Sequence, residues 1–209
     1  MKTKCLIFIG LTSLLFHANI SHGQVMAGIR EGVAASTFSA KGALADNDKI
    51  ILSHLSGVFA TVPVSKFFAI QPEINYLKKG RSNETSQLGV STQTDFSINY
   101  LQVPLQLQYR DGTISSNGKS VFYFTGGPYV AFALDNEQST TLGESTTVLV
   151  TKNTRDTDWG LTFGIGLQTA VKNQRVRFDL KYDMGLSEIG GQPEDFRTKC
   201  LSLSVGVVL

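Results

Sequence analysis

Few side chains in this sequence are suited to act as bases, nucleophiles or metal ligands, since 209 residues include only three His and two Cys. Cys5, His17 and His22 lie in an N-terminal segment that is expected to be removed, which leaves His54 and Cys200. A catalytic base needs a nucleophile and an orienting group beside it, and His54 is interpreted as a surface histidine without chemistry, while Cys200 has no Cys or His partner in the sequence. No Cys/His spacing typical of a metal site occurs. The sequence therefore predicts no enzymatic activity, no metal and no cofactor.

Four acids in the polar segments could hold a loop calcium ion, which oxygen ligands favour. Solvated loop side chains are the simpler interpretation of this set: Asp46, Asp48, Asp156 and Asp158.

The strongest pattern is an alternation of apolar and charged residues over residues 176–184. Val176, Phe178, Leu180, Tyr182 and Met184 alternate with four charges of alternating sign, which are Arg177, Asp179, Lys181 and Asp183. A period of two predicts a β-strand with one apolar and one charged face. Neighbouring charges on the polar face can neutralise one another.

The first 23 residues are expected to be a signal peptide, and residues 24–209 to form one β-barrel domain. Lys2 and Lys4 precede a mostly apolar run, and Ser21 and Gly23 supply small residues at a cleavage site. Removing both lysines from the 19 basic residues leaves 17, which equals the 17 acidic residues. A mature chain with no net charge gives no reason to expect nucleic-acid binding. No apolar run reaches the roughly 18 residues of a transmembrane helix.

The same period of two recurs about eight times along the chain. Expected strands cover residues 25–35, 55–62, 67–78, 96–110, 122–132, 159–168, 176–184 and 201–209. The fourth strand changes phase between Tyr100 and Leu101, which predicts a β-bulge. Residues 79–93 are expected to form a polar loop, and residues 147–150 a hairpin beyond the barrel. The fold class is therefore all-β, an eight-stranded antiparallel up-and-down barrel.

Side-chain volume decides which face of the strands points outward. About 40 apolar side chains alternate with small and polar ones, whereas the interior of an eight-stranded barrel holds on the order of a dozen. The apolar face must therefore meet lipid, with Tyr76 and Trp159 near the outer rim and Tyr109 near the inner one. A soluble lipocalin-like carrier is the alternative. The charged side chains then fill the lumen as a structural network of Arg30, Glu73, Arg110, Arg177, Asp179, Lys181 and Asp183.

Several short motifs, in this order and spacing, resemble the PorT-like "porin family" of outer-membrane barrels from Bacteroidetes-type bacteria. They are Gln71-Pro72-Glu73-Ile74-Asn75-Tyr76, Asn99-Tyr100-Leu101-Gln102-Val103-Pro104, Gly126-Gly127-Pro128-Tyr129 and Tyr182-Asp183-Met184-Gly185-Leu186. The resemblance covers essentially the whole mature chain and implies an eight-stranded OmpX/OmpA-like barrel without a defined activity. Such barrels usually end in Phe, whereas this chain ends in Leu209.

We therefore expect a non-enzymatic protein of a Gram-negative outer membrane, with both termini in the periplasm. Its expected partners are outer-membrane lipid, the barrel-insertion machinery and an extracellular or secretion-system protein. Loops that serve binding or envelope integrity are the favoured role. An accessory part in protein secretion and a lipid-modifying enzyme are the alternatives.

Overall fold

The computed structural model describes residues 25–40, 48–87, 90–110, 120–142, 145–150, 156–188 and 196–209, and all of its regular structure there is β-strand. The strands are β1 Met26–Ala40, β2 Asp48–Pro63, β3 Phe68–Gln87, β4 Val90–Arg110, β5 Ser120–Leu142, β6 Ser145–Val150, β7 Thr157–Val171, β8 Gln174–Gly185 and β9 Phe196–Val208. The predicted signal peptide lies outside these residues. In the described part of the chain no helix is long and apolar enough to cross a membrane.

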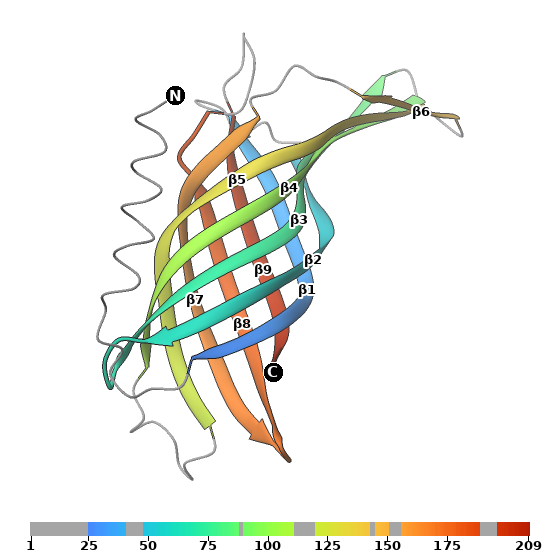
Figure 1. Ribbon diagram of the computed structural model, residues 1–209. Helices are drawn as coiled ribbons and strands as arrows, with labels where there is room; N and C mark the ends of the chain where they lie inside the picture. Colours follow the sequence, from blue (N-terminus) through green and yellow to red (C-terminus); the bar gives the residue numbers. More distant parts are fainter. Residues whose placement is uncertain are drawn as a thin grey trace.

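Eight of the described strands close into an antiparallel barrel. The order is β4-β3-β2-β1-β9-β8-β7-β5, and pairing of β4 with β5 closes the circle (Figure 1). Each barrel strand pairs with the next barrel strand in the sequence, so β5 pairs with β7 and β6 pairs only with β5, and β1 pairs with β9. The predicted eight-stranded up-and-down topology is confirmed.

Strands β3, β4 and β5 continue beyond the barrel, where the sequence analysis expected a polar loop and a Thr/Ser-rich segment. Pairing of β3 with β4 runs on to Gln87 and Val90, and β6 pairs with β5 from Glu137 to Leu142. The expectation of a loop over residues 79–93 is therefore wrong, because polar β-formers continue the ladder. The predicted hairpin at residues 147–150 is present as part of β6. Figure 1 shows that this strand extension leans away from the barrel.

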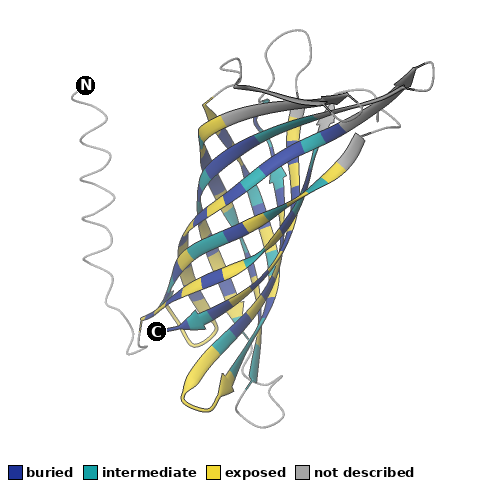
Figure 2. Cartoon of the chain, turned by 90° about the vertical axis from the view of Figure 1, so that its right-hand side faces the viewer, coloured by how far each residue is buried: buried dark blue, intermediate teal, exposed yellow. Residues whose placement is uncertain are grey.

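The apolar face of the strands points outward. On β8, Phe178, Leu180 and Tyr182 are exposed while Arg177 and Asp179 are buried. Figure 2 shows the same alternation of buried and exposed residues around the whole barrel. A soluble carrier of the lipocalin type would place its apolar side chains inside, so this arrangement excludes that alternative.

The phase of β4 does not change at Tyr100. Ile98, Tyr100 and Gln102 are all buried, so they share the lumen face. The irregularity lies in β5 instead, because Asn99 pairs with Asp135 and Tyr100 pairs with Ala133, which leaves Leu134 as the extra residue. A bulge is therefore present at the predicted level but in β5, and the predicted phase change of β4 is wrong because it assumed that every apolar side chain of β4 faces lipid.

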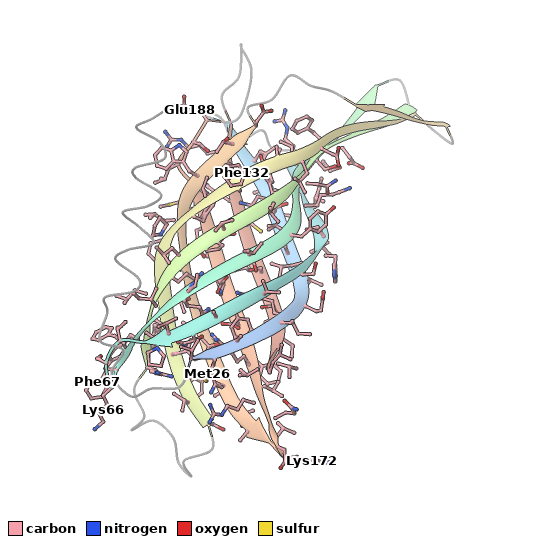
Figure 3. All side chains as sticks on the ribbon, in the orientation of Figure 1. Met26, Lys66, Phe67, Phe132, Lys172 and Glu188 are labelled. Atoms are coloured by element: carbon pink, nitrogen blue, oxygen red, sulfur yellow. The ribbon has the colours of Figure 1, made fainter. Side chains whose placement is uncertain are left out.

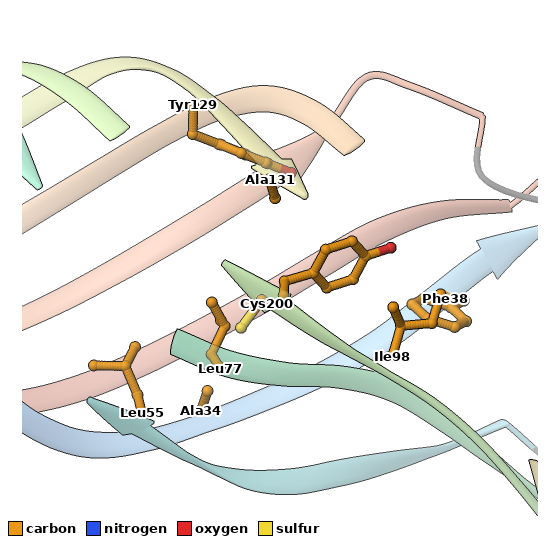
Figure 4. Close-up of a cluster of buried hydrophobic side chains, with 9 residues drawn as sticks. Ala34, Phe38, Leu55, Leu77, Ile98, Tyr129, Ala131 and Cys200 are labelled. Atoms are coloured by element: carbon orange, nitrogen blue, oxygen red, sulfur yellow. The ribbon is translucent and has the colours of Figure 1, made fainter. Parts of the chain in front are cut away.

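Apolar side chains inside the barrel form a cluster toward the end that carries the strand extension (Figure 4). Its buried members are Ala34, Phe38, Leu55, Leu77, Ile98, Tyr100, Tyr129, Ala131 and Cys200. Phe38 also packs edge-on against Phe96, with ring centroids 5.9 Å apart. The lumen is therefore filled by an apolar layer as well as by charges.

Glycine at position 166 makes room for an aromatic side chain in the lumen. A Cβ at Gly166 would collide with the Tyr123 ring, which lies over this residue from β5. We expect Gly166→Ala to lower the free energy of unfolding by about 1–3 kcal/mol, because it overpacks the lumen. Urea unfolding of the protein refolded in detergent measures this change.

Gly126→Ala is the matched control, because a Cβ there would come no nearer than 3.5 Å to another side chain. Equal stability of the Gly166→Ala variant and the parent protein would contradict the packing account.

Candidate functional site

The lumen is organised around the carboxylate of Glu73, which is fully buried on β3. Arg30 of β1 approaches one oxygen at 2.5 Å, and Lys181 of β8 approaches the other at 2.5 Å. The side-chain amides of Gln71 and Asn75 donate to the same carboxylate at 2.5 Å and 3.1 Å. Three strands are thereby tied together across the interior by one acid.

A second group surrounds Arg177 on the side of the barrel that holds the termini. Arg177 donates to the Tyr123 hydroxyl at 2.9 Å, to Gln71 at 2.9 Å and to Thr61 at 3.1 Å. The Tyr123 hydroxyl in turn donates to Asp179 at 2.6 Å. The guanidinium also stacks against the rings of Phe59 and Tyr123, each 4.5 Å away.

A third group, Lys79 with Asp158, lies among the apolar cluster, and sequence reasoning did not find it. Both side chains are fully buried, with Lys79 Nζ 3.4 Å from the Asp158 carboxylate. Asp158 also accepts hydrogen bonds from Thr198 at 2.9 Å, from Tyr129 at 3.2 Å and from Ser187. Lys79 Nζ sits 4.5 Å from the centre of the Tyr129 ring. Asp158 is therefore not the solvated loop acid that the sequence suggested.

Asp183 is the buried acid with the fewest contacts. It accepts one hydrogen bond, from Gln102 at 3.0 Å, and borders a small cavity between the Glu73 group and the apolar cluster. The space left there is about 10 Å³, which is about what one water molecule needs. The described side chains therefore leave little space at this point of the lumen.

The buried charges of the described lumen balance. Four cations, Arg30, Lys79, Arg177 and Lys181, face four anions, Glu73, Asp158, Asp179 and Asp183. Arg110, which sequence reasoning placed in this network, lies at the end of β4 and is only half-buried. Arg175 and Arg177 repel it, so the structure does not bring it into the paired groups.

Aromatic side chains mark both ends of the outer surface. Tyr76 and Trp159 are 42% and 53% exposed, and Tyr109 is 39% exposed beside Phe68, with ring centroids 5.3 Å apart. Figure 3 shows Phe132 at one end of the barrel and Phe67 at the other. This arrangement suits a protein held between two membrane interfaces.

His54, which the sequence analysis interpreted as a surface residue, contacts an acid on the outer surface. Glu31 of β1 and His54 of β2 form a pair, with Oε2 and Nε2 2.7 Å apart and both side chains about two-thirds exposed. Glu31 breaks the apolar alternation of β1 in the sequence, and that irregularity was the signal of the pair. The partner could not be recognised without the β1–β2 register.

Cys200 is buried in the apolar cluster and has no disulfide partner among the described residues. Cys200 packs as a small apolar side chain in this cluster, opposite Asp183 across the β8–β9 ladder.

Glu73→Gln tests the central role of this carboxylate. The substitution leaves Arg30 and Lys181 buried without their anion, and we expect a loss of about 3–5 kcal/mol in unfolding free energy. Urea titration of the refolded barrel measures it.

Adding Lys181→Met to Glu73→Gln removes one of the two unpaired cations and should recover part of this loss. A double variant that is less stable than Glu73→Gln alone would contradict the assigned pairing.

Comparison with known proteins identifies the family. Residues 18–190 match the family described as outer membrane protein beta-barrel domain. No curated protein sequence matches the chain. Similar solved structures include the outer-membrane protein OprG of Pseudomonas aeruginosa, which is 14% identical with a TM-score of 0.50, covering 90% of this chain and 98% of that one. Ail of Yersinia pestis is 15% identical with a TM-score of 0.46, covering 90% of this chain and 100% of that one. At such identities the likeness to OprG supports the fold alone. The match of residues 18–190 to the family covers most of this chain and shows that the chain belongs to the outer-membrane β-barrel family.

Proposed function

We propose that this outer-membrane barrel is closed to solutes and serves to hold its strand extension outside the cell for binding or for envelope integrity. The observation that carries the proposal is the charge-balanced lumen. Each buried cation is close to a buried anion or an aromatic ring, and the cavity beside Asp183 is of the size of one water molecule. A path for solutes would need this network to open.

The ends of the barrel support an orientation with both termini in the periplasm. Met26 and the short turns at Lys66 and Lys172 lie at one end, and the strand extension lies at the other (Figure 3). Outer-membrane barrels have short periplasmic turns and longer extracellular connections. Insertion machinery in the periplasm is the expected partner of the last strand, which is followed by Leu209 where such barrels usually end in Phe.

The strand extension offers a means of binding a protein. Among the described strands β6 pairs only with β5, which leaves the backbone groups of its other edge without a strand partner. Such an edge can accept an extended segment of another chain. An extracellular protein or a secretion-system protein would fit this role equally. On the lumen side the role is non-enzymatic, because the charged groups bind one another.

We expect the purified protein to show no stepwise conductance when inserted in planar lipid bilayers, because the paired charges fill the lumen. A porin of known conductance reconstituted in the same way is the control. Regular conductance steps from the parent protein would contradict the closed barrel.

Protease added to intact cells should cut the strand extension and spare both ends of the mature chain, and mass spectrometry of the fragments reads out the sites. Cleavage at the turn of residues 64–67 in intact cells would contradict the orientation.

A further inference from the structure

The outer surface carries a polar group at a depth where its neighbours are apolar. Glu31 lies between the exposed side chains of Ile29 and Val33 on β1. It stands five residues beyond Met26, the first residue of β1. Ser56 pairs with Glu31 on one side and with Tyr76 on the other, so Glu31 lies near the level of Tyr76. An ionisable residue on the lipid-facing surface is costly and is a functional candidate by default.

The pair with His54 extends this group toward the end of the barrel that holds the strand extension. His54 pairs with Val33, which is two residues beyond Glu31 on β1 and corresponds to about 5 Å along the axis. With the proposed orientation, the pair therefore occupies the outer half of the membrane. Lipid ester groups lie near that edge of the band.

A serine completes the group. Ser56 pairs directly with Glu31 across the β1–β2 ladder and lies two residues from His54 on the same face of β2. Directly opposed side chains have Cβ atoms about 5 Å apart, and residues two apart on a strand are about 7 Å apart. In the described contacts Ser56 makes no side-chain hydrogen bond, so its hydroxyl is available to the imidazole when a substrate is bound.

We propose that Ser56, His54 and Glu31 form an ester-hydrolysing site on the lipid-facing surface, with an acyl ester of a membrane lipid as substrate. Serine, imidazole and carboxylate at these separations are the parts of a nucleophilic triad, which is recognised by geometry and not by sequence order. The site adds an activity outside the lumen and departs from the expectation that the chain is no enzyme. Its placement in the outer leaflet rests on the proposed orientation.

Each step of the reaction has a residue to perform it. His54 takes the proton of Ser56 as Oγ attacks the acyl carbonyl, and Glu31 holds the imidazole and stabilises its charge. The ester C–O bond then breaks, and the lipid alcohol leaves with the proton from His54. Water, activated by His54, attacks the acyl-serine, releases the fatty acid and restores the serine hydroxyl.

A β-bulge of β2 against β3 lies beside this site. Ile50 pairs with Arg81 and Leu55 with Leu77, so β2 has one more residue than β3 between these pairs. The extra residue of a bulge is left out of the ladder, and bulges are frequent next to active sites. A backbone N–H released from pairing there would serve the developing negative charge.

The test uses the full-length mature protein in detergent micelles, so that orientation plays no part. Phosphatidylethanolamine and lipopolysaccharide are offered separately, and mass spectrometry measures the fatty acid released. We expect release from one of them, with the responding lipid naming the source of the ester. Ser56→Ala and His54→Gln should each lower the rate more than about a hundredfold.

Ser204→Ala is the matched control, because Ser204 is buried on the lumen face of β9. It should keep the parent rate. A fluorophosphonate probe should add one label to the parent protein and to Ser204→Ala, and none to Ser56→Ala.

Glu31→Val separates a catalytic role from a structural one. A positioning role predicts slower hydrolysis together with a higher urea midpoint, because an apolar residue suits lipid better. Unchanged hydrolysis in Glu31→Val would remove Glu31 from the site.

The parent protein must be folded for the test, and heat-modifiable gel mobility shows that it is. The proposal is overturned if this folded protein releases no fatty acid from either lipid and does not react with the probe. These results leave the conductance and surface-proteolysis tests of the binding role unaffected.

Discussion

The structure depends on the narrow interior of an eight-stranded barrel, in which every charged side chain must be paired with an opposite charge inside the lumen. Water is almost excluded there, so an unpaired ion would cost several kcal/mol. Glu73 meets this constraint by binding Arg30 and Lys181 at once. Lys79 and Asp158 satisfy the same constraint as a second buried ion pair, which lies within the apolar cluster and among its tyrosines. The same pairing makes the described lumen neutral and ties together strands that are distant in the sequence.

Filling the interior with polar side chains leaves the large apolar ones for the outside, where lipid replaces the protein core as their surroundings. Glu31 with His54 is the exception on this surface, and it lies in the half of the band near the strand extension. The barrel thus separates two kinds of polar group. Those inside are bound to one another and serve stability, whereas the outer pair has a nearby serine and open access to lipid.

Periodicity allowed the strand count, the topology and the outward apolar face to be predicted, because alternation directly records which side a residue faces. The alternating charges of β8 gave four of the eight buried lumen ions. Lys79 and Asp158 were missed, because each lies in a segment so polar that a loop was the natural interpretation. Ile98 and Tyr100 were assigned to the wrong face, since an apolar layer in the lumen leaves no trace in composition. The contact of Glu31 with His54 needed the register of β1 against β2, which a single sequence does not contain.

The face that each strand presents to lipid is the central claim, and a spin-label scan of β8 tests it most directly. Single cysteines would replace residues 176–184 in turn, in a Cys200→Ala background, and collision with oxygen would be measured in lipid bilayers. The account predicts high accessibility to oxygen at Phe178, Leu180 and Tyr182, and low accessibility at Arg177, Asp179 and Lys181. Reversed alternation, or equal accessibility at all positions, would contradict it.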